Sequence, residues 1–391
     1  MASPDPITPA ETSDRDDPLA RAADRFAPGE AGVLYFDTNS VGAMPRAAHD
    51  ALLRLGHEWR GLRRRGWSDS DWLDAPTRLG DKLAPVIGAE PGSVLFGDGT
   101  SVNLHKMLAA ALAMRPGRRA VVVEDGAFPT DNYVAENLAP EVRRAASPEG
   151  LAAALGDDAA VLFLSHTDYR TGYRHDLAAL TRLAHERGAL ALWDLSHSAG
   201  AVACGLASAR ADFAVGCGYK YLCGGPGAPA WLYVAPRHQA AARPAIAGWM
   251  GHADPMAFEA RYRPADGVRR HLAATPAVAG NLLMEAALDL WADVDPAQAF
   301  ERHARLGEAL IAAVEASAAR TGLALASPRE PARRGGFVAF RHANAGAFVA
   351  RLEKAGVVAS ARKPDIVRFG LSPLQHRFAD LRELGERLQR I

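Results

Sequence analysis

The chain has 391 residues, of which 49% are hydrophobic and 23% are charged, and its 45 basic and 45 acidic residues leave a formal charge of zero. This composition is typical of a globular protein long enough to form two or three domains. A neutral chain has no long-range field to attract nucleic acid or an anionic membrane, and neither a membrane-spanning apolar run nor a signal-peptide pattern is evident. We therefore expect a globular protein whose partners include neither nucleic acid nor a membrane.

The first 30 residues are rich in Pro, Asp, Ala and Ser and lack apolar periodicity, so residues 1–30 are predicted to form a disordered tail. Order is expected from about Leu34, where a short apolar strand leads into a polar turn with Asn39 and Ser40. These two residues are either turn formers or contacts for a bound molecule.

A basic helix is predicted over residues 47–65. Its arginines, Arg63, Arg64 and Arg65, suit a solvated helix face better than a nucleic-acid patch, because no aromatic residues are interleaved with them. Trp67 follows as either a core anchor or the wall of a pocket.

A glycine-rich turn follows the predicted strand Ser93–Phe96 and precedes a helix that starts near Thr100 and Ser101. Glycines let the backbone approach an anion, and free N–H groups at a helix N-terminus bind it together with hydroxyls. Thr100 and Ser101 are therefore predicted phosphate ligands, with a plain helix N-cap as the alternative.

A second turn joins the buried strand at residues 120–125 to a helix and carries Phe128, Pro129, Thr130 and Asp131. A Phe presented by a Pro-stiffened turn offers a face for a flat ring, although a Phe at such a turn also commonly belongs to the core.

Another strand, Val161–Leu164, ends at Ser165 and His166, and a loop with Asp168 then leads to a helix over residues 176–187. With the strand at residues 190–193, strands and helices alternate along this half of the chain. The alternation predicts a doubly wound, mostly parallel sheet.

The most informative stretch is Leu190 to Val234, where two apolar runs deliver Asp194 and Lys220 at their ends. The carboxyl ends of parallel strands are where α/β sheets bind ligands. An Asp and a Lys in this position suit pyridoxal phosphate (PLP), which needs an amine to hold its aldehyde and an anion beside its pyridine nitrogen. His197 is expected to hold the Asp194 carboxylate or to lie against the ring, and Tyr219 to bond the phosphate or relay a proton.

Three cysteines, Cys204, Cys217 and Cys223, lie within this stretch, and none is part of a CxxC motif. They are expected to be small buried hydrophobes in a reducing, cytoplasmic setting. No metal site is predicted.

The remaining chain predicts helices over residues 280–294, 296–321 and 344–355 and a small α+β domain at residues 291–391. Arg368 lies on a strand whose alternate residues are apolar, so its guanidinium is expected to be buried. A buried guanidinium requires an anion, which is either a substrate carboxylate or a neighbouring acidic side chain.

The motifs WDLSHSAGAV, ADFAVGCGYKYLCGGPGAPAWLYV and Phe-Pro-Thr-Asp together resemble the kynureninase family from about Tyr35 onward. The resemblance implies PLP fold type I of the class V aminotransferase group, with a seven-stranded-type sheet in a large domain at residues 31–290. It implies that Phe128 stacks on the cofactor ring, that Asp131 orients a neighbour and that Ser165 lies beside the cofactor. It also assigns the substrate carboxylate to Arg368 and makes Asn39, Ser40 and Trp67 candidate substrate contacts.

The same resemblance implies a homodimer with shared active sites, because Trp249 and Thr275 match family residues that reach the phosphate of the neighbouring subunit's cofactor. The chain departs from the family pattern at five positions. Asp168 stands for Asn, His271 for Phe, Ala274 for Gly, Ser360 for Asp and Gln375 for Tyr.

The implied reaction is PLP-dependent hydrolysis of the Cβ–Cγ bond of L-kynurenine or a substituted kynurenine, with Lys220, Asp194 and Tyr219 as catalytic residues. The alternatives are another class V PLP reaction, by a lyase, desulfurase or aminotransferase, and a non-enzymatic binding protein on the same scaffold. A desulfurase needs a mobile nucleophilic Cys late in the chain, where this sequence has none.

Overall fold

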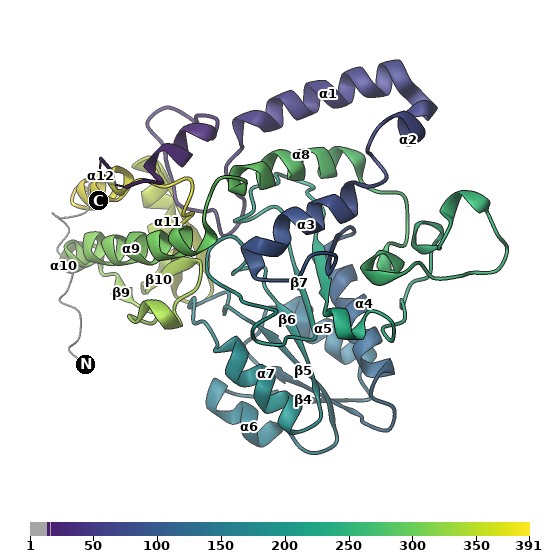
Figure 1. Cartoon of the computed structure of the whole chain (residues 1–391). Coiled ribbons are helices and arrows are strands. Elements are labelled where there is room, and N and C mark those ends of the chain that lie inside the picture. Colours follow the sequence, from purple (N-terminus) through teal and green to yellow (C-terminus); the bar gives the residue numbers. More distant parts are fainter. Residues whose placement is uncertain (1–13, 16) are drawn as a thin grey trace.

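The computed structural model describes residues 14–15 and 17–391, and its centre is a seven-stranded sheet (Figure 1). The strands follow the order β2-β8-β7-β6-β5-β3-β4. β8 is antiparallel to both of its neighbours, whereas the other six strands run parallel to one another. This arrangement confirms the predicted fold class. The strands are β2 (Val94–Phe96), β3 (Ala120–Glu124), β4 (Glu141–Ala145), β5 (Ala159–Ser165), β6 (Leu190–Asp194), β7 (Phe213–Gly216) and β8 (Trp231–Val234).

Helices cover both faces of this sheet, because successive side chains of a buried strand point to opposite sides. Trp193 packs into the core beneath α3, α6, α7 and α8, whereas its neighbour Leu192 packs into the core beneath α4 and α5. The helices are α3 (Ala75–Ile87), α4 (Thr100–Ala113), α5 (Pro129–Leu138), α6 (Leu151–Ala154), α7 (Leu177–Glu186) and α8 (Val278–Leu288). Helices α1 (Arg46–Leu62) and α2 (Gly66–Asp69) lie outside this layer, and α1 packs on α8 (Figure 1).

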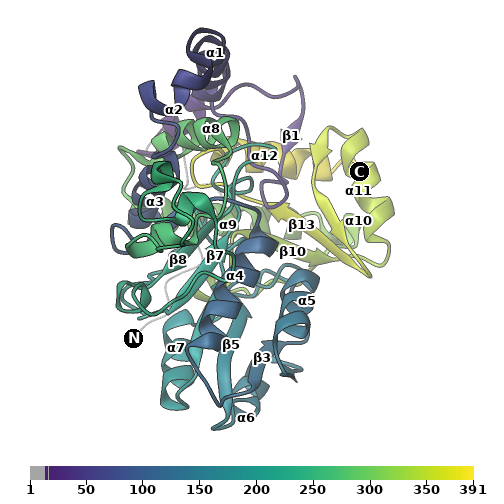
Figure 2. The ribbon, with the colours of Figure 1, turned by 90° about the vertical axis from the view of Figure 1, so that its right-hand side faces the viewer.

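A smaller four-stranded antiparallel sheet stands beside the large one (Figure 2). It has its own apolar core, which includes Leu306, Phe340 and Phe348. Its strands, in the order β12-β13-β10-β9, are β9 (Ala324–Leu325), β10 (Phe337–Arg341), β12 (Ser360–Arg362) and β13 (Ile366–Gly370). Its helices are α9 (Pro296–Glu315), α10 (Ala318–Thr321), α11 (Ala345–Lys354) and α12 (Phe378–Leu388).

The N-terminal segment is attached to this smaller part. Strand β1 (Leu34–Tyr35) pairs in parallel with β11 (Val357–Val358), and the buried Asp17 forms an ion pair with the buried Arg302 at 2.6 Å. A 3-10 helix occupies Ala20–Arg25. The prediction of a disordered tail is therefore wrong for residues 17–30, because apolar and charged groups of this segment find partners on the C-terminal part. The rest of the predicted tail, apart from Asp14 and Arg15, lies outside the described residues. The boundary near residue 290 stays a prediction.

Some elements differ from the sequence-based prediction in extent. The expected strand to Tyr219 ends at Gly216, so Lys220 lies in the following turn rather than directly at a strand end. Between β8 and α8 the chain forms an arm with short 3-10 turns at Trp249–Gly251 and Gly267–His271, which projects from the sheet at the right of Figure 1. Within residues 14–15 and 17–391, no helix is both long and apolar enough to cross a bilayer.

Candidate functional site

Most of the predicted cofactor residues line one cavity of about 110 Å³ at the carboxyl ends of the parallel strands. Asp194 ends β6 and Ser165 ends β5, and the two are register partners. Both lie on the sheet face that α4 and α5 cover, and the starts of these helices and the loops that follow β5, β6 and β7 contribute the remaining wall. The lining residues are Thr100, Ser101, Leu104, Phe128, Thr130, Asp131, Ser165, Thr167, Asp194, Ser196, His197, Tyr219 and Lys220.

Two buried carboxyl groups, those of Asp131 and Asp194, are neighbours in this cavity. Oδ1 of Asp194 accepts the Ser196 N–H at 2.8 Å, and Oδ2 of Asp131 accepts the Ser165 hydroxyl at 2.6 Å. Burial raises the pKa of Asp131 well above its ordinary value, and the Asp194 charge raises it further. Burial also raises the pKa of Asp194, but the Ser196 bonds and the Lys220 charge oppose that effect. Asp131 therefore holds the proton of the pair, and Asp194 is the carboxylate.

Lys220 lies close to two aromatic side chains. Its Nζ is 3.3 Å from Nε2 of His197 and 5.7 Å from the centroid of the Tyr219 ring. Burial and the lysine charge lower the pKa of His197 well below its ordinary value, so the imidazole is neutral and accepts a hydrogen bond from the ammonium. Burial raises the pKa of Tyr219 to about 12, which keeps its hydroxyl protonated. His197 thus contacts Lys220, while the backbone of Ser196 holds the Asp194 carboxylate, a role that the sequence had suggested for His197.

The predicted phosphate ligands begin helix α4. Gly99 is its N-cap and no side chain caps it in the described structure, so the N–H groups of the first turn and the two hydroxyls remain open to the cavity. The preceding turn is fixed by the buried Lys106, whose Nζ contacts the Asp98 carboxylate and donates to the His271 carbonyl at 2.8 Å. The plain N-cap alternative does not describe this helix start.

Phe128 presents its ring at the cavity and leaves 42% of its surface exposed. Its edge partner is Tyr169, whose ring centroid lies 5.3 Å away at an interplanar angle of 89°. The backbone carbonyl of Tyr169 accepts a hydrogen bond from Nη1 of Arg368 at 2.6 Å. Tyr169, in the loop of residues 166–175, therefore contacts both Phe128, which is predicted to stack on the ring, and Arg368, which is predicted to bind the substrate carboxylate.

Arg368 is completely buried on β13, as predicted. Its Nε and Nη2 donate to Oγ of Ser360 at 3.3 and 3.1 Å, and its guanidinium lies 5.2 Å from the Phe337 ring centroid. Within the described structure its hydrogen-bond partners are a hydroxyl and a carbonyl and no carboxylate forms an ion pair with it, so the neighbouring acidic side chain expected as the alternative is not found. Burial, reinforced by the Arg362 charge, lowers the pKa of Arg368 to about 10. Such a desolvated cation favours binding of an external anion.

The candidate substrate contacts separate into two groups. Nδ2 of the buried Asn39 lies 3.5 Å from Oγ of Ser360, next to Arg368, and its Oδ1 has no partner in the described structure. Ser40 instead donates to Asp37 within its own turn, as a turn former does. Trp67 packs edge-on against Trp72 beside α1 and does not line the cavity.

Trp249 and Thr275 also lie away from the cavity of their own subunit. Trp249 is 40% exposed on the arm, where its ring stacks on Phe258 at 6.3 Å, and Thr275 is exposed. Their exposure is compatible with contacts to a second subunit, and such contacts remain a prediction.

The departures from the family pattern have distinct surroundings. Both ring nitrogens of the buried His271 lack partners in the described part of the chain, and burial lowers its pKa to about 4. Gln375 accepts from the Thr38 hydroxyl at 3.3 Å, and Ala274 is exposed. Asp168 folds back on its own loop, where its Oδ1 accepts three hydrogen bonds.

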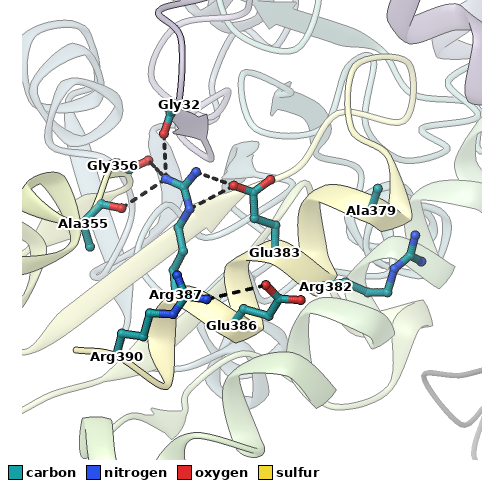
Figure 3. A pocket seen from close by; sticks show the side chains of 9 residues that line it. All are labelled: Gly32, Ala355, Gly356, Ala379, Arg382, Glu383, Glu386, Arg387 and Arg390. Carbon is teal, nitrogen blue, oxygen red and sulfur yellow. Dashed lines mark hydrogen bonds and ion pairs between the residues drawn. The ribbon is translucent and has the colours of Figure 1, made fainter.

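A larger cavity, of about 850 Å³, lies beside α12 (Figure 3). Arg387 occupies its centre and donates to the carbonyls of Gly32, Ala355 and Gly356 while it contacts Glu383. Because this arginine joins the N-terminal segment to the small domain, we interpret the cavity as a structural junction.

Sequence reasoning missed Thr167, Ser196, Tyr169 and the ring-nitrogen contact of His197. Ser196 and Tyr169 act through backbone atoms, for which side-chain identity gives no signal. Thr167 bonds the Ser198 hydroxyl at 2.8 Å across two loops, a pairing that depends on the tertiary fold.

The residues present fit PLP. They offer an open helix N-terminus for a phosphate, an exposed Phe face for a ring, a buried carboxylate for a pyridine nitrogen and a lysine for an aldehyde. The buried Oδ1 of Asp131 has no partner in the described structure, which leaves hydrogen-bonding capacity beside the ring position.

Comparisons with known proteins agree with this fit. The kynureninase C-terminal domain family model matches residues 300–388. A kynureninase of Pseudomonas fluorescens is 42% identical over 96% of this chain and 94% of its own length. A kynureninase of Burkholderia pseudomallei is also 42% identical, over 97% of this chain and 93% of its own length. A cysteine desulfurase structure from Thermococcus onnurineus superposes with a TM-score of 0.77 at 17% identity, covering 100% of this chain and 99% of its own. The structure of the cystine C–S lyase C-DES with cysteine persulfide superposes with a TM-score of 0.76 at 18% identity, covering 93% of this chain and 98% of its own. These two structures share the fold of this chain, and the 42% identity over almost the full length of the bacterial enzymes shows that the chain belongs to the kynureninase family.

Proposed function

We propose that this protein is a PLP-dependent hydrolase that cleaves the Cβ–Cγ bond of L-kynurenine or a ring-substituted kynurenine, giving an anthranilate-type acid and L-alanine. The observation that carries the proposal is the single cavity that unites Lys220, the Asp194 carboxylate and the open N-terminus of α4. Kynureninase relatives that match almost the whole chain support the same reaction.

The cofactor supplies an electron-withdrawing ring that makes the substrate Cα proton labile and stabilises negative charge at Cβ. Thr100 and Ser101 would hold its phosphate, Phe128 one face of its ring, Asp194 its ring nitrogen and Lys220 its aldehyde. Asp194 suits this role because it is the charged member of the Asp131–Asp194 pair.

The Lys220 amine is the base that removes the Cα proton and later returns a proton. Neutral His197 accepts from Nζ at 3.3 Å and so orients the amine toward the cavity. Water adds to the γ-carbonyl carbon, its oxygen stays in the released aryl carboxylate, and a proton reaches Cβ. Tyr219 is suited to donate that proton, because it lines the cavity beside Lys220 and its hydroxyl is protonated, with a pKa that burial raises to about 12.

Arg368 binds the substrate carboxylate in this proposal. It is a buried cation held by one hydroxyl and one carbonyl, and the carboxylate supplies the counter-charge that it lacks in the described structure. Asn39, next to Ser360, adds an amide beside the same position.

The active form is proposed to be a homodimer in which Trp249 and Thr275 complete the neighbouring site. The exposure of both residues, and of Phe258 beside Trp249, supports such an interface. A cytoplasmic location is proposed because the three cysteines are free and buried.

Incubation of the purified protein and PLP with L-kynurenine and with 3-hydroxykynurenine tests the reaction. Release of equal amounts of alanine and the matching anthranilate is the expected result, and the ratio of kcat/KM gives the ring preference. Desulfuration is not favoured, because Cys204, Cys217 and Cys223 are all buried and burial raises the pKa of each thiol. Sulfide release from cysteine without alanine release from kynurenine would refute the proposal.

A further inference from the structure

We infer that Asp168 is a positioning residue for substrate binding, acting through the backbone carbonyl of Tyr169 on Arg368. This inference rests on the proposed role of Arg368 as the carboxylate ligand. Asp168 itself does not line the cofactor cavity, so its effect passes through the loop that it organises.

The Asp168 side chain fixes the loop that follows it. Its Oδ1 accepts from the Arg170 N–H at 3.2 Å, from the Thr171 N–H at 2.6 Å and from the Thr171 hydroxyl at 2.6 Å. Its backbone closes the same turn, because its N–H donates to the Tyr173 carbonyl at 2.8 Å and its carbonyl accepts from Gly172 at 3.0 Å. An aspartate that bonds N–H groups two and three residues ahead replaces the secondary structure that a loop lacks.

The residue enclosed by this turn is Tyr169, and it contacts both Arg368 and Phe128. Its carbonyl accepts from Nη1 of Arg368 at 2.6 Å, and its ring packs edge-on against Phe128 at 5.3 Å. Of the three hydrogen bonds that hold the Arg368 guanidinium in the described structure, this one is the shortest, and the other two share Oγ of Ser360. The direction of the guanidinium therefore depends on where the loop places one carbonyl oxygen.

The far end of the loop is anchored to the small domain, which carries Arg368. The Thr171 carbonyl accepts from the Ser327 hydroxyl at 2.5 Å, and the Gly172 carbonyl accepts from the Gly335 N–H at 2.8 Å. Gly172 has a φ of 72°, and a Cβ there would lie 2.9 Å from the Phe337 carbonyl oxygen, so a glycine is needed where the loop approaches β10 this closely. With both ends held, loss of the Asp168 contacts moves the part between them, which is Tyr169.

The acceptor geometry, and not the charge, carries this role. Only Oδ1 is used, and an asparagine offers the same carbonyl oxygen at the same position. The presence of Asp168 where the family pattern has Asn therefore leaves the hydrogen bonds that hold the loop intact.

Steady-state kinetics with kynurenine test the inference on Asp168→Ala, Asp168→Asn and Asp176→Ala. Asp176 is the matched control, because its side chain caps α7 by accepting from the Ala179 N–H at 2.9 Å in the same segment. Asp168→Ala is expected to raise KM about tenfold while kcat changes less than about threefold, since binding and not chemistry depends on the Arg368 direction. Asp168→Asn and Asp176→Ala are expected to keep KM within about twofold.

A second readout uses a compound that is not itself turned over. The inhibition constant of 4-oxo-4-phenylbutanoate, which has the carboxylate and aryl ketone but no amine, should rise about tenfold in Asp168→Ala and stay unchanged in Asp176→Ala. Hydrogen exchange of the Arg170 and Thr171 amides should accelerate in Asp168→Ala alone. An unchanged KM and inhibition constant in Asp168→Ala, an equal rise in Asp176→Ala or a failure of Asp168→Asn to restore KM would each overturn the inference.

Arg368→Gln separates this inference from the proposed function. If Arg368→Gln leaves KM unchanged, the assignment of the carboxylate to Arg368 fails. If Arg368→Gln raises KM and Asp168→Ala does not, the assignment of Arg368 stands and only the positioning role of Asp168 fails.

Discussion

Asp131 and Asp194 place two carboxyl groups side by side in a buried site, and only one of them carries a charge. Ser165 and Ser196 each bond one member of the pair, and the neighbouring Asp194 charge raises the pKa of Asp131 further above its usual range. The two aspartates are thus chemically different although both lie where a cofactor ring is expected.

Amide substitutions should separate the two roles. Asp131→Asn mimics the protonated carboxyl group, because it retains an acceptor for Ser165 and a donor toward Asp194, and it should keep kcat within about tenfold. Asp194→Asn removes the anion from the ring nitrogen and should lower kcat by at least about a hundredfold. Equal losses in both variants, measured with saturating PLP, would contradict the proton assignment.

Lys220→Ala should abolish both alanine release and the visible absorption of PLP bound through its aldehyde. Lys354→Ala is the control, because it removes an exposed lysine on α11. A Lys220→Ala protein that still hydrolyses kynurenine would show that the lysine is not the base.

Mixing two inactive variants tests the shared site. Trp249→Ala subunits lack the residue proposed to serve the neighbour, and Lys220→Ala subunits lack their own amine. When equal amounts are unfolded and refolded together, half of the dimers contain one of each, and one of their two sites is intact. The mixture should therefore regain about a quarter of the wild-type activity, whereas sites built within one subunit would give no regain.

Buried neutral histidines predict a loss of stability in acid. Burial lowers the pKa of His303 from 6.5 to about 3, so its proton binds mainly to the unfolded chain. The stability that it contributes is present above pH 6.5 and is lost as the pH falls toward 3, by about 1.4 kcal/mol per pH unit. Urea unfolding of wild type and His303→Gln between pH 7.5 and 5 measures this as a difference in slope. Asp131, whose raised pKa acts in the opposite direction, is present in both proteins and cancels.

The exposed His49 provides the control for this measurement. His49→Gln should keep the wild-type slope, because it changes a side chain on the exposed surface of α1 and leaves the buried core intact. A His303→Gln slope identical to that of wild type would contradict the prediction.

Strands that are buried on both faces could be predicted from the sequence, because they appear as continuous apolar runs, as β5 and β6 do. The edge strand β4 was not predicted, because its sequence Glu-Val-Arg-Arg-Ala leaves one side to solvent and alternates poorly. The cavity residues Asp194, Lys220 and Phe128 follow from local motifs, since Asp194 ends a strand, Phe128 precedes a helix and Lys220 lies between an apolar run and a glycine-rich turn. Tyr169 could not be found in this way, because what it contributes is a backbone carbonyl directed at a residue 199 positions away.

The ion pair between Asp17 and Arg302 makes the segment that starts at Asp17 part of the folded protein. Deleting the first 30 residues, which composition alone marks as dispensable, would leave the arginine inside the protein without its counter-charge. A shortened version made for crystallisation should therefore melt earlier than the full-length chain, even though every residue of the PLP cavity is retained.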